Sequence, residues 1–413
     1  MLEDFVGPAA AQRLRSCILG SQLDTFSAGL LALGHKLSTI RHKLWVIGDL
    51  THWMRRKQLA VVDLDERRIV QYLHARRRRG RSCRGFGPTA LRLIEQLRSG
   101  GILRRPMATV ADSPVATLLA RYEGYLRRER ALEDGTIAAY QSFVRAFAME
   151  RLGANAAGPG SLRPGHVRDF LLRRVGRMHP ARAQFMATAL RSFLRFLFLR
   201  GETSTDLSLT IPTVRRWRLS SVPRHLPVRD VERLLRGCDR SSATGRRDYA
   251  ILLLLAKLGL RACEVLSLEL SDLHWREGEI VVRGKGLVHD RLPLLPDVGR
   301  ALALYLQKDR PICDSRRVFL CRRAPHRGLG HPSTVSTIVA RALARADLAP
   351  ATRGAHLLRH SLAVTMVRRG ASLSEIGQVL RHRSPNTTEI YAKVDFSALR
   401  GVAVPWPVVR GGR

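Results

Sequence analysis

The chain has 413 residues, a length typical of about two to four domains. Its 71 Lys and Arg residues against 34 Asp and Glu residues give a net charge of +37, and its 45% hydrophobic content argues against a disordered chain. A charge of this size favours a polyanionic partner, either nucleic acid or an anionic membrane. The longest apolar run, Ile251 to Ala256, is too short for the roughly 20 residues of a membrane-spanning helix, so nucleic acid is the favoured partner.

The N-terminal segment and the cysteines indicate the compartment. The first residues carry acids before any basic side chain and lack an apolar core, so they do not indicate a secretory signal. Six cysteines occur without a CxxC pair, which is typical neither of a zinc site nor of a disulfide framework. We therefore expect a bacterial cytoplasmic protein that associates with the nucleoid when bound to DNA, and no membrane partner.

The N-terminal half contains two similar segments. Apolar residues recur at helical spacing in 39–53, 64–77 and 89–101, and again in 136–149, 162–174 and 188–201. The offset drifts only from 97 to 99 residues, both segments contain TALR, and Tyr72 matches Phe170. The pattern predicts two copies of one helical unit, in domains at 1–110 and 111–205.

Basic side chains mark candidate DNA contacts. The densest cluster is Arg76, Arg77, Arg78 and Arg79, and Lys257 lies on the helix before Arg261. These residues are either a solvated surface or a row that contacts DNA phosphates, and the net charge favours the second interpretation.

Different patterns follow a linker predicted at 206–224. Residues 246–270 predict a buried helix, a turn with Gly259 at the helix C-cap, and a second helix. Residues 279–294 predict a β-hairpin around a Gly-Lys-Gly turn. Helical patterns resume at Val298 and extend to about Tyr391, and the tail at 399–413 is irregular.

Six side chains of the C-terminal half form a constellation suited to phosphodiester chemistry. They are Arg261, Lys285, His356, Arg359, His382 and Tyr391. Two guanidiniums can bind the non-bridging oxygens and stabilise the charge of a pentavalent transition state. A tyrosine can serve as the nucleophile, a lysine as the acid for the leaving oxygen, and histidines as proton carriers. The sequence shows no cluster of acids suited to metal ligation, so we expect no metal site and no cofactor.

The sequence motifs around these residues resemble those of the tyrosine recombinases, the phage-integrase and Xer-type family. The resemblance rests on GLRACEVLSLELSDL at Arg261, GKG at Lys285, HLLRH at His356 and Arg359, and LRHRSPNTTEIYAKVD through His382 and Tyr391. It implies a mainly α-helical multidomain fold. Helical SAM-like core-binding domains would precede a mixed α/β catalytic domain with a small antiparallel sheet, at 225–398.

The resemblance also implies a role for each matching residue. Tyr391 would attack the scissile phosphate and form a 3′-phosphotyrosyl bond, while Arg261 and Arg359 hold that phosphate. Lys285 would protonate the 5′ oxygen. His356 would assist proton transfer, and His382 would donate a hydrogen bond to the phosphate. Glu264 would hold the Arg261 side chain in position without contacting the phosphate.

The same resemblance implies double-stranded DNA as the partner and a tetramer on synapsed duplexes, with sister recombinases as candidate partners. The extra N-terminal copy suggests a mobile element such as a transposon. Two alternatives remain: a type IB topoisomerase, which rejoins the same strand, and a non-catalytic accessory DNA-binding protein.

The sequence departs from the family pattern at two positions. The family often has Leu-Gly-His where this chain has Leu-Arg381-His, so a bulky cation replaces the glycine of a tight turn. Cys263 stands where a small residue is frequent, and we expect it to be buried. We interpret His360, one turn from His356, as a structural residue.

Overall fold

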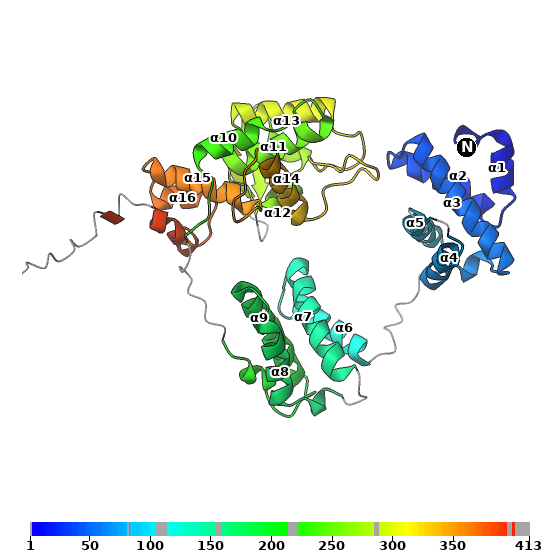
Figure 1. Ribbon diagram of the computed structural model, residues 1–413, viewed down its shortest axis with the longest axis horizontal. Helices are drawn as coiled ribbons and strands as arrows, with labels where there is room; N and C mark the ends of the chain where they lie inside the picture. The colour runs from blue at the N-terminus through cyan, green and yellow to red at the C-terminus, as the bar shows by residue number, and fades with distance from the viewer. Residues whose placement is uncertain are drawn as a thin grey trace, which may run out of the picture. The chain divides into compact units, whose positions relative to one another are not determined.

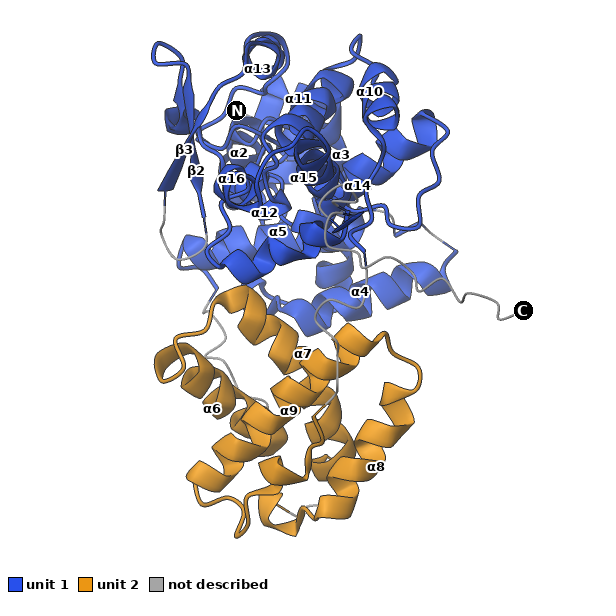
Figure 2. Ribbon diagram, turned by 90° about the vertical axis from the view of Figure 1, so that its left-hand side faces the viewer, with its two compact units in different colours: residues 1–103, 221–413 blue, residues 104–220 orange. Residues whose placement is uncertain are grey.

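The computed structural model describes residues 2–80, 82–83, 85–103, 114–153, 158–213, 222–284, 289–394 and 399–400. The chain divides into two compact units, one of residues 104–220 and the other of residues 1–103 and 221–413 (Figure 2). Residues 2–103 and residues 222–394 each build hydrophobic cores of their own. Within the described ranges, no helix is long and apolar enough to cross a membrane.

Residues 2–103 form a helical bundle around one hydrophobic core (Figure 1). Its helices are α1 (Pro8–Arg15), α2 (Gly20–Ala32), α3 (Leu37–Arg56), α4 (Glu66–Arg78) and α5 (Phe86–Ser99). The Asp65 carboxylate caps α4 by accepting the Arg68 N–H at 2.7 Å. Ile69 and Tyr72 are buried, which places the predicted apolar face of α4 against α5.

The second unit repeats this design around a separate core. Its helices are α6 (Pro114–Arg128), α7 (Asp134–Leu152), α8 (Pro164–Val175) and α9 (Pro180–Leu199). Val167 and Phe170 are buried on α8, as Ile69 and Tyr72 are on α4, whereas the duplication of one helical unit stays a prediction. Leu207 and Ile211 also pack into this core, and the unit therefore extends into the segment expected to be linker.

Residues 222–394 contain helices and a small sheet. The helices are α10 (Val228–Arg236), α11 (Ala243–Lys257), α12 (Ala262–Ser267), α13 (Pro296–Lys308), α14 (Pro332–Arg345), α15 (His356–Arg368) and α16 (Leu373–Val379). The strands β1 (Leu273–His274), β2 (Glu279–Arg283) and β3 (His289–Pro293) pair antiparallel in the order β1-β2-β3. The apolar helix α11 packs against α13 and α15, which confirms its predicted burial. The mainly helical fold with a small antiparallel sheet agrees with the sequence.

The prediction of helical structure throughout 298–391 is wrong between α13 and α14. Residues 309–331 run without a helix and make isolated bridges, Glu269 to Arg317 and Leu320 to Gly328. Pro311 and Pro325 lack the N–H groups that a helix needs, and Gly residues disfavour it further. Buried side chains such as Phe319 fix this segment on the core instead.

Arg76 is not a surface residue, in contrast to the prediction that it contacts DNA. Only 6% of the residue is exposed, and its guanidinium pairs with Asp49 and donates to the Ser82 carbonyl at 3.1 Å. The guanidinium also lies 3.8 Å from the ring centroid of Phe86. The Tyr72 hydroxyl donates to the same Asp49 carboxylate at 2.6 Å. The helical period turns Arg76 toward the interior, whereas Arg77, Arg78 and Arg79 are exposed.

We expect Arg76→Met to destabilise the N-terminal bundle by about 2–3 kcal/mol, because it leaves the Asp49 carboxylate without its cation. Amide hydrogen exchange of α3, α4 and α5 in the full chain measures this change. The adjacent Arg77→Met is the control, and we expect an effect within about 0.5 kcal/mol. Equal protection in the two variants would contradict a structural role for Arg76.

Candidate active site

A turn at Gly259 begins the site. The helix α11 ends at Lys257, and Gly259 follows with a φ of +60°, the left-handed conformation predicted for its C-cap. A Cβ on Gly259 would lie 2.7 Å from Leu380 Cδ2, so both the conformation and the space require glycine. The turn places Arg261 at the N-terminus of α12.

Glu264 holds Arg261 in two ways. Its carboxylate accepts the Arg261 backbone N–H at 2.8 Å and the guanidinium Nη1 at 2.5 Å. Glu264 is 3% exposed, and burial by itself raises the pKa of its carboxyl group. The Arg261 N–H and the charges of Arg381 and Arg261 outweigh burial and lower that pKa, so the carboxylate stays ionised. The predicted support of Arg261 by Glu264 has this geometry.

The Arg359 guanidinium hydrogen-bonds to carbonyl groups of two loops. It lies on α15, is 3% exposed, and donates from Nη1 to the Gly259 carbonyl and from Nη2 to the Leu380 carbonyl. Burial, with the positive charges of Arg261 and Arg381, lowers its pKa to about 10. The Arg261 side chain is 33% exposed, so Arg261 is the member of the pair that solvent reaches.

Tyr391 is buried in a small core and contacts a histidine. It lies on the 3₁₀ helix Glu389–Val394, is 1% exposed, and packs with apolar residues of α15 and α16. Its hydroxyl lies 2.8 Å from His360 Nδ1. Burial raises the pKa of Tyr391 to about 12, against a lowering effect of Arg359. Burial and the neighbouring His356 and Arg359 lower the pKa of His360 to about 4.

His360 is therefore the residue that sequence reasoning missed, because the sequence led us to consider it structural. The available signal was its spacing in HLLRH, since His360 follows His356 by one helical turn on α15. Only the fold shows that the phenol approaches His360. His356 is exposed at the first residue of α15, and its ring centroid lies 6.3 Å from that of His360. Partial desolvation and the charges of Arg359 and Arg261 lower the pKa of His356.

His382 lies beside the tyrosine. Its ring is parallel to that of Tyr391, with centroids 6.4 Å apart and 2° between the planes. Its Nδ1 is 2.7 Å from the hydroxyl of the buried Thr388. Burial and the charges of Arg359 and Arg261 lower the pKa of His382 to about 4. A ring held in this way is neutral at physiological pH.

The other residues that the sequence analysis named have three different outcomes. Lys285 falls outside the described residues, although β2 and β3 on either side of it form the predicted hairpin. Lys257 is exposed at the end of α11, with Nζ 3.9 Å from Asp297. Cys263 is exposed, which contradicts its expected burial, because the short helix α12 turns this position to solvent.

Arg381 occupies the position where the family pattern has glycine. Its φ is +55°, so the backbone does make the tight left-handed turn. The side chain is 5% exposed and donates from Nη2 to Glu264 at 2.9 Å. Arg381 thus belongs to the site, and its carbonyl accepts Arg261 Nη2 at 3.3 Å.

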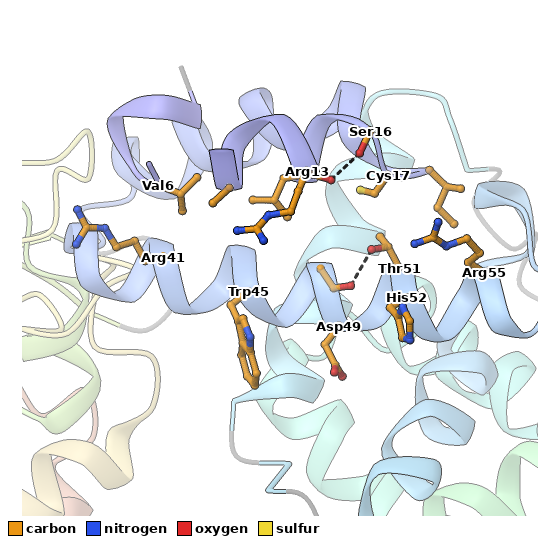
Figure 3. A pocket seen from close by; sticks show the side chains of 14 residues that line it. Val6, Arg13, Ser16, Cys17, Arg41, Trp45, Asp49, Thr51, His52 and Arg55 are labelled. Carbon is orange, nitrogen blue, oxygen red and sulfur yellow. Dashed lines mark hydrogen bonds between the residues drawn. The ribbon is translucent and has the colours of Figure 1, made fainter. Parts of the chain in front are cut away.

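A separate cleft lies between α1 and α3 (Figure 3). It has a volume of about 460 Å³ and includes Arg13, Arg41 and Arg55 in its lining. The candidate active-site residues on α12, α15 and the segment 380–391 do not line it, so its position does not mark that site. Within the described residues, no group of three His, Cys, Asp or Glu side chains is arranged to hold a metal ion.

The histidines predict a loss of stability in acid. Both His360 and His382 have a pKa of about 4 against an ordinary value of 6.5, so the unfolded chain binds more protons between these values. Their stabilisation is present above pH 6.5 and is lost as the pH falls toward 4. We expect His360→Gln to reduce the loss between pH 7 and pH 5 by about 1–2 kcal/mol. Urea unfolding at both pH values measures this, and His289→Gln on exposed β3 is the control, for which we expect the wild-type loss.

Comparison with known proteins identifies relatives of this chain. The sequence model described as the phage integrase family matches residues 224–398. The putative integrase/recombinase y4rA of Sinorhizobium fredii (strain NBRC 101917 / NGR234) is 42% identical over 385 residues, covering 92% of this chain and 93% of that protein. The tyrosine recombinase XerD of Listeria monocytogenes serotype 4b (strain F2365) is 30% identical over 293 residues, covering 69% and 96%.

Solved structures show the same fold. The XerH site-specific recombinase in a post-cleavage complex with palindromic difH has a TM-score of 0.55 and 20% identity, covering 72% of this chain and 90% of that chain. A lambda integrase (75–356) dimer bound to a COC′ core site has a TM-score of 0.51 and 19% identity, covering 71% and 99%. With the 42% identity over most of both sequences, these findings show that the chain belongs to the phage integrase family of tyrosine recombinases.

Proposed function

We propose that the protein is a site-specific DNA recombinase that cuts and rejoins strands through Tyr391. Tyr391 Oη bonds to the scissile phosphorus, the bond from phosphorus to the 5′ oxygen breaks, and a 3′-phosphotyrosyl link remains. The phenol proton passes to a base, and the departing oxygen takes a proton from Lys285. Rejoining reverses these steps with a new 5′ hydroxyl. Because the link conserves the phosphodiester energy, the cycle needs no ATP.

The surroundings of Tyr391 are the observation that carries this proposal. Its phenol contacts His360, its ring is parallel to His382, and Arg359 acts on it electrostatically. Arg261 and Arg359 supply the positive charge that stabilises a pentavalent phosphate, so we propose that cleavage does not depend on a divalent ion. His356 remains a proposed proton carrier, and His382 a proposed donor to the phosphate.

The contact between Tyr391 and His360 belongs to the protein before DNA binds. Burial raises the pKa of Tyr391 and lowers that of His360, so both shifts disfavour moving the phenol proton to His360. His360 therefore holds the neutral phenol as an acceptor before DNA binds. We propose that the phenol leaves this buried position to reach the phosphate, where the guanidiniums lower its pKa.

We also propose that the two helical units and the catalytic domain bind double-stranded DNA. The net charge of +37 and the exposed Arg77, Arg78 and Arg79 of the N-terminal bundle support this. A tetramer on synapsed DNA, with sister recombinases as candidate partners, and a role in a mobile element are part of the same proposal. The solved relatives include a lambda integrase tetramer bound to a Holliday junction.

Tyr391→Phe tests the nucleophile. We expect wild-type protein to form a covalent adduct on a nicked recombination site, with EDTA present, and Tyr391→Phe to form none while it still binds DNA. Denaturing gel electrophoresis of labelled DNA measures the adduct. Tyr249→Phe, in the same domain beside Arg240, is the control and keeps the adduct. An adduct in Tyr391→Phe, or one that EDTA abolishes, would contradict the proposal.

The adduct assay, together with two plasmid assays, separates the alternatives. A type IB topoisomerase would relax supercoiled plasmid without dependence on a site, and an accessory protein would bind DNA without forming an adduct. A recombinase instead exchanges strands between two cognate sites, which a plasmid inversion assay detects.

The exposed arginines predict the salt dependence of binding. Replacing Arg77, Arg78 and Arg79 with Gln should reduce the slope of log affinity against log salt by about 0.9 for each lost phosphate contact. Binding isotherms between low and moderate salt measure the slope. The triple variant of Arg229, Arg233 and Arg236 on α10 is matched in charge. An equal reduction in both triples would show a general charge effect and no contact specific to α4.

A further inference from the structure

Arg381 combines an unfavourable backbone with an unusually buried side chain. Among the described residues, four non-glycine residues have a positive φ: Gln58, Ala131, Asp347 and Arg381. Glycine adopts this conformation without the steric cost that a side chain brings. The Arg381 side chain is only 5% exposed, so the chain keeps an arginine, buried, where glycine would relieve the backbone. The contacts of the guanidinium indicate the reason.

The guanidinium completes the set of donors around one carboxylate. Glu264 Oε2 accepts Arg381 Nη2 at 2.9 Å and the Arg261 backbone N–H at 2.8 Å, while Oε1 accepts Arg261 Nη1 at 2.5 Å. Arg381 Nη1 donates to the Val379 carbonyl at 3.1 Å and the Leu258 carbonyl at 3.4 Å. One residue thus joins the end of α16, the end of α11 and the acid that orients Arg261.

Its remaining nitrogen faces the sheet. Within the described residues, Arg381 Nε is buried without a hydrogen-bond partner, and Asp290 Oδ2 lies 4.0 Å away. Asp290 belongs to β3 and pairs with Val282 of β2. A small movement of β3 toward Arg381 would convert this ion pair into a hydrogen bond. The hairpin and the loop that carries His382 are therefore coupled through a single guanidinium.

We propose that Arg381 is a positioning residue for strand cleavage, which fixes Arg261 through their shared carboxylate and links β3 to the site through Asp290. The inference rests on the proposed function for its effect on cleavage, but the positioning itself is a property of the protein without DNA. Arginine suits this position because its planar guanidinium donates hydrogen bonds to a carboxylate and to carbonyl oxygens at the same time. A lysine ammonium cannot do this in the same geometry.

The first test needs no DNA. We expect Arg381→Gly to increase amide hydrogen exchange at least tenfold at Arg261 and in β3, because the carboxylate and the strand lose a common partner. Asp347→Gly relieves the same backbone conformation at another place in this domain and is the matched control. Unchanged exchange at both places in Arg381→Gly would overturn the proposal, whatever the protein does to DNA.

The second test measures single-turnover cleavage of a nicked site together with DNA affinity. We expect Arg381→Gly to lower the cleavage rate at least tenfold with DNA affinity within threefold, and Arg381→Lys to recover only part of the rate. We expect Asp290→Asn to lower the rate less, with His289→Gln on β3 as its control. Wild-type rates in Arg381→Gly or in Arg381→Lys would overturn the positioning role.

The two tests keep the proposals separate. If wild-type protein forms no adduct, the proposed function fails, and the exchange experiment still decides whether Arg381 positions Arg261. If Arg381→Gly does not fold, Arg381→Lys provides both readouts, and wild-type exchange and cleavage in that variant would overturn the inference.

Discussion

The candidate site depends on the bonds from the Arg359 guanidinium to the carbonyls of Gly259 and Leu380. These carbonyls belong to the loop before Arg261 and to the loop before His382, which are far apart in the sequence. A buried cation must satisfy its donors, and these two oxygens are the acceptors that the fold offers. The same contacts bring Arg261 and His382 to one place. Arg359 is nearly buried and Arg261 is partly exposed, so the two guanidiniums differ in their access to solvent.

Within the described residues, the positive charge of this site exceeds what the buried carboxylate of Glu264 neutralises. Arg261, Arg359 and Arg381 lie around Glu264. Burial, with the charges of the neighbouring guanidiniums, depresses the pKa values of His382 and of Arg359. Such a site is costly to bury without an anion. A phosphodiester would relieve the repulsion, which gives a physical reason for coupling DNA binding to the ordering of the site. Burial, with these charges in addition, keeps the histidines beside Tyr391 neutral.

The two helical units bury matching positions of α4 and α8. Apolar positions on α4 and α8 are buried in equivalent ways, with Ile69 and Tyr72 in one unit and Val167 and Phe170 in the other. An arginine follows on each helix, and Arg76 and Arg174 each lie over an aromatic ring. Arg76 is buried, so it is removed from the surface available to DNA, whereas the Arg174 side chain is 33% exposed. A count of arginines in the sequence therefore overstates the number of phosphate contacts.

The sequence by itself determined three helices of each unit, the strands of the hairpin, the Gly259 turn and the family motifs, because these depend on local spacing and on residues with distinctive backbone preferences. It did not indicate α1, α2 or α6. Only the tertiary structure decided that His360 meets Tyr391, that Arg76 is buried, and that Arg381 shares Glu264 with Arg261. These contacts join residues 27 to 117 positions apart, or depend on which face of a helix turns inward. Such pairings follow from how the helices pack, and no local pattern in one sequence specifies them.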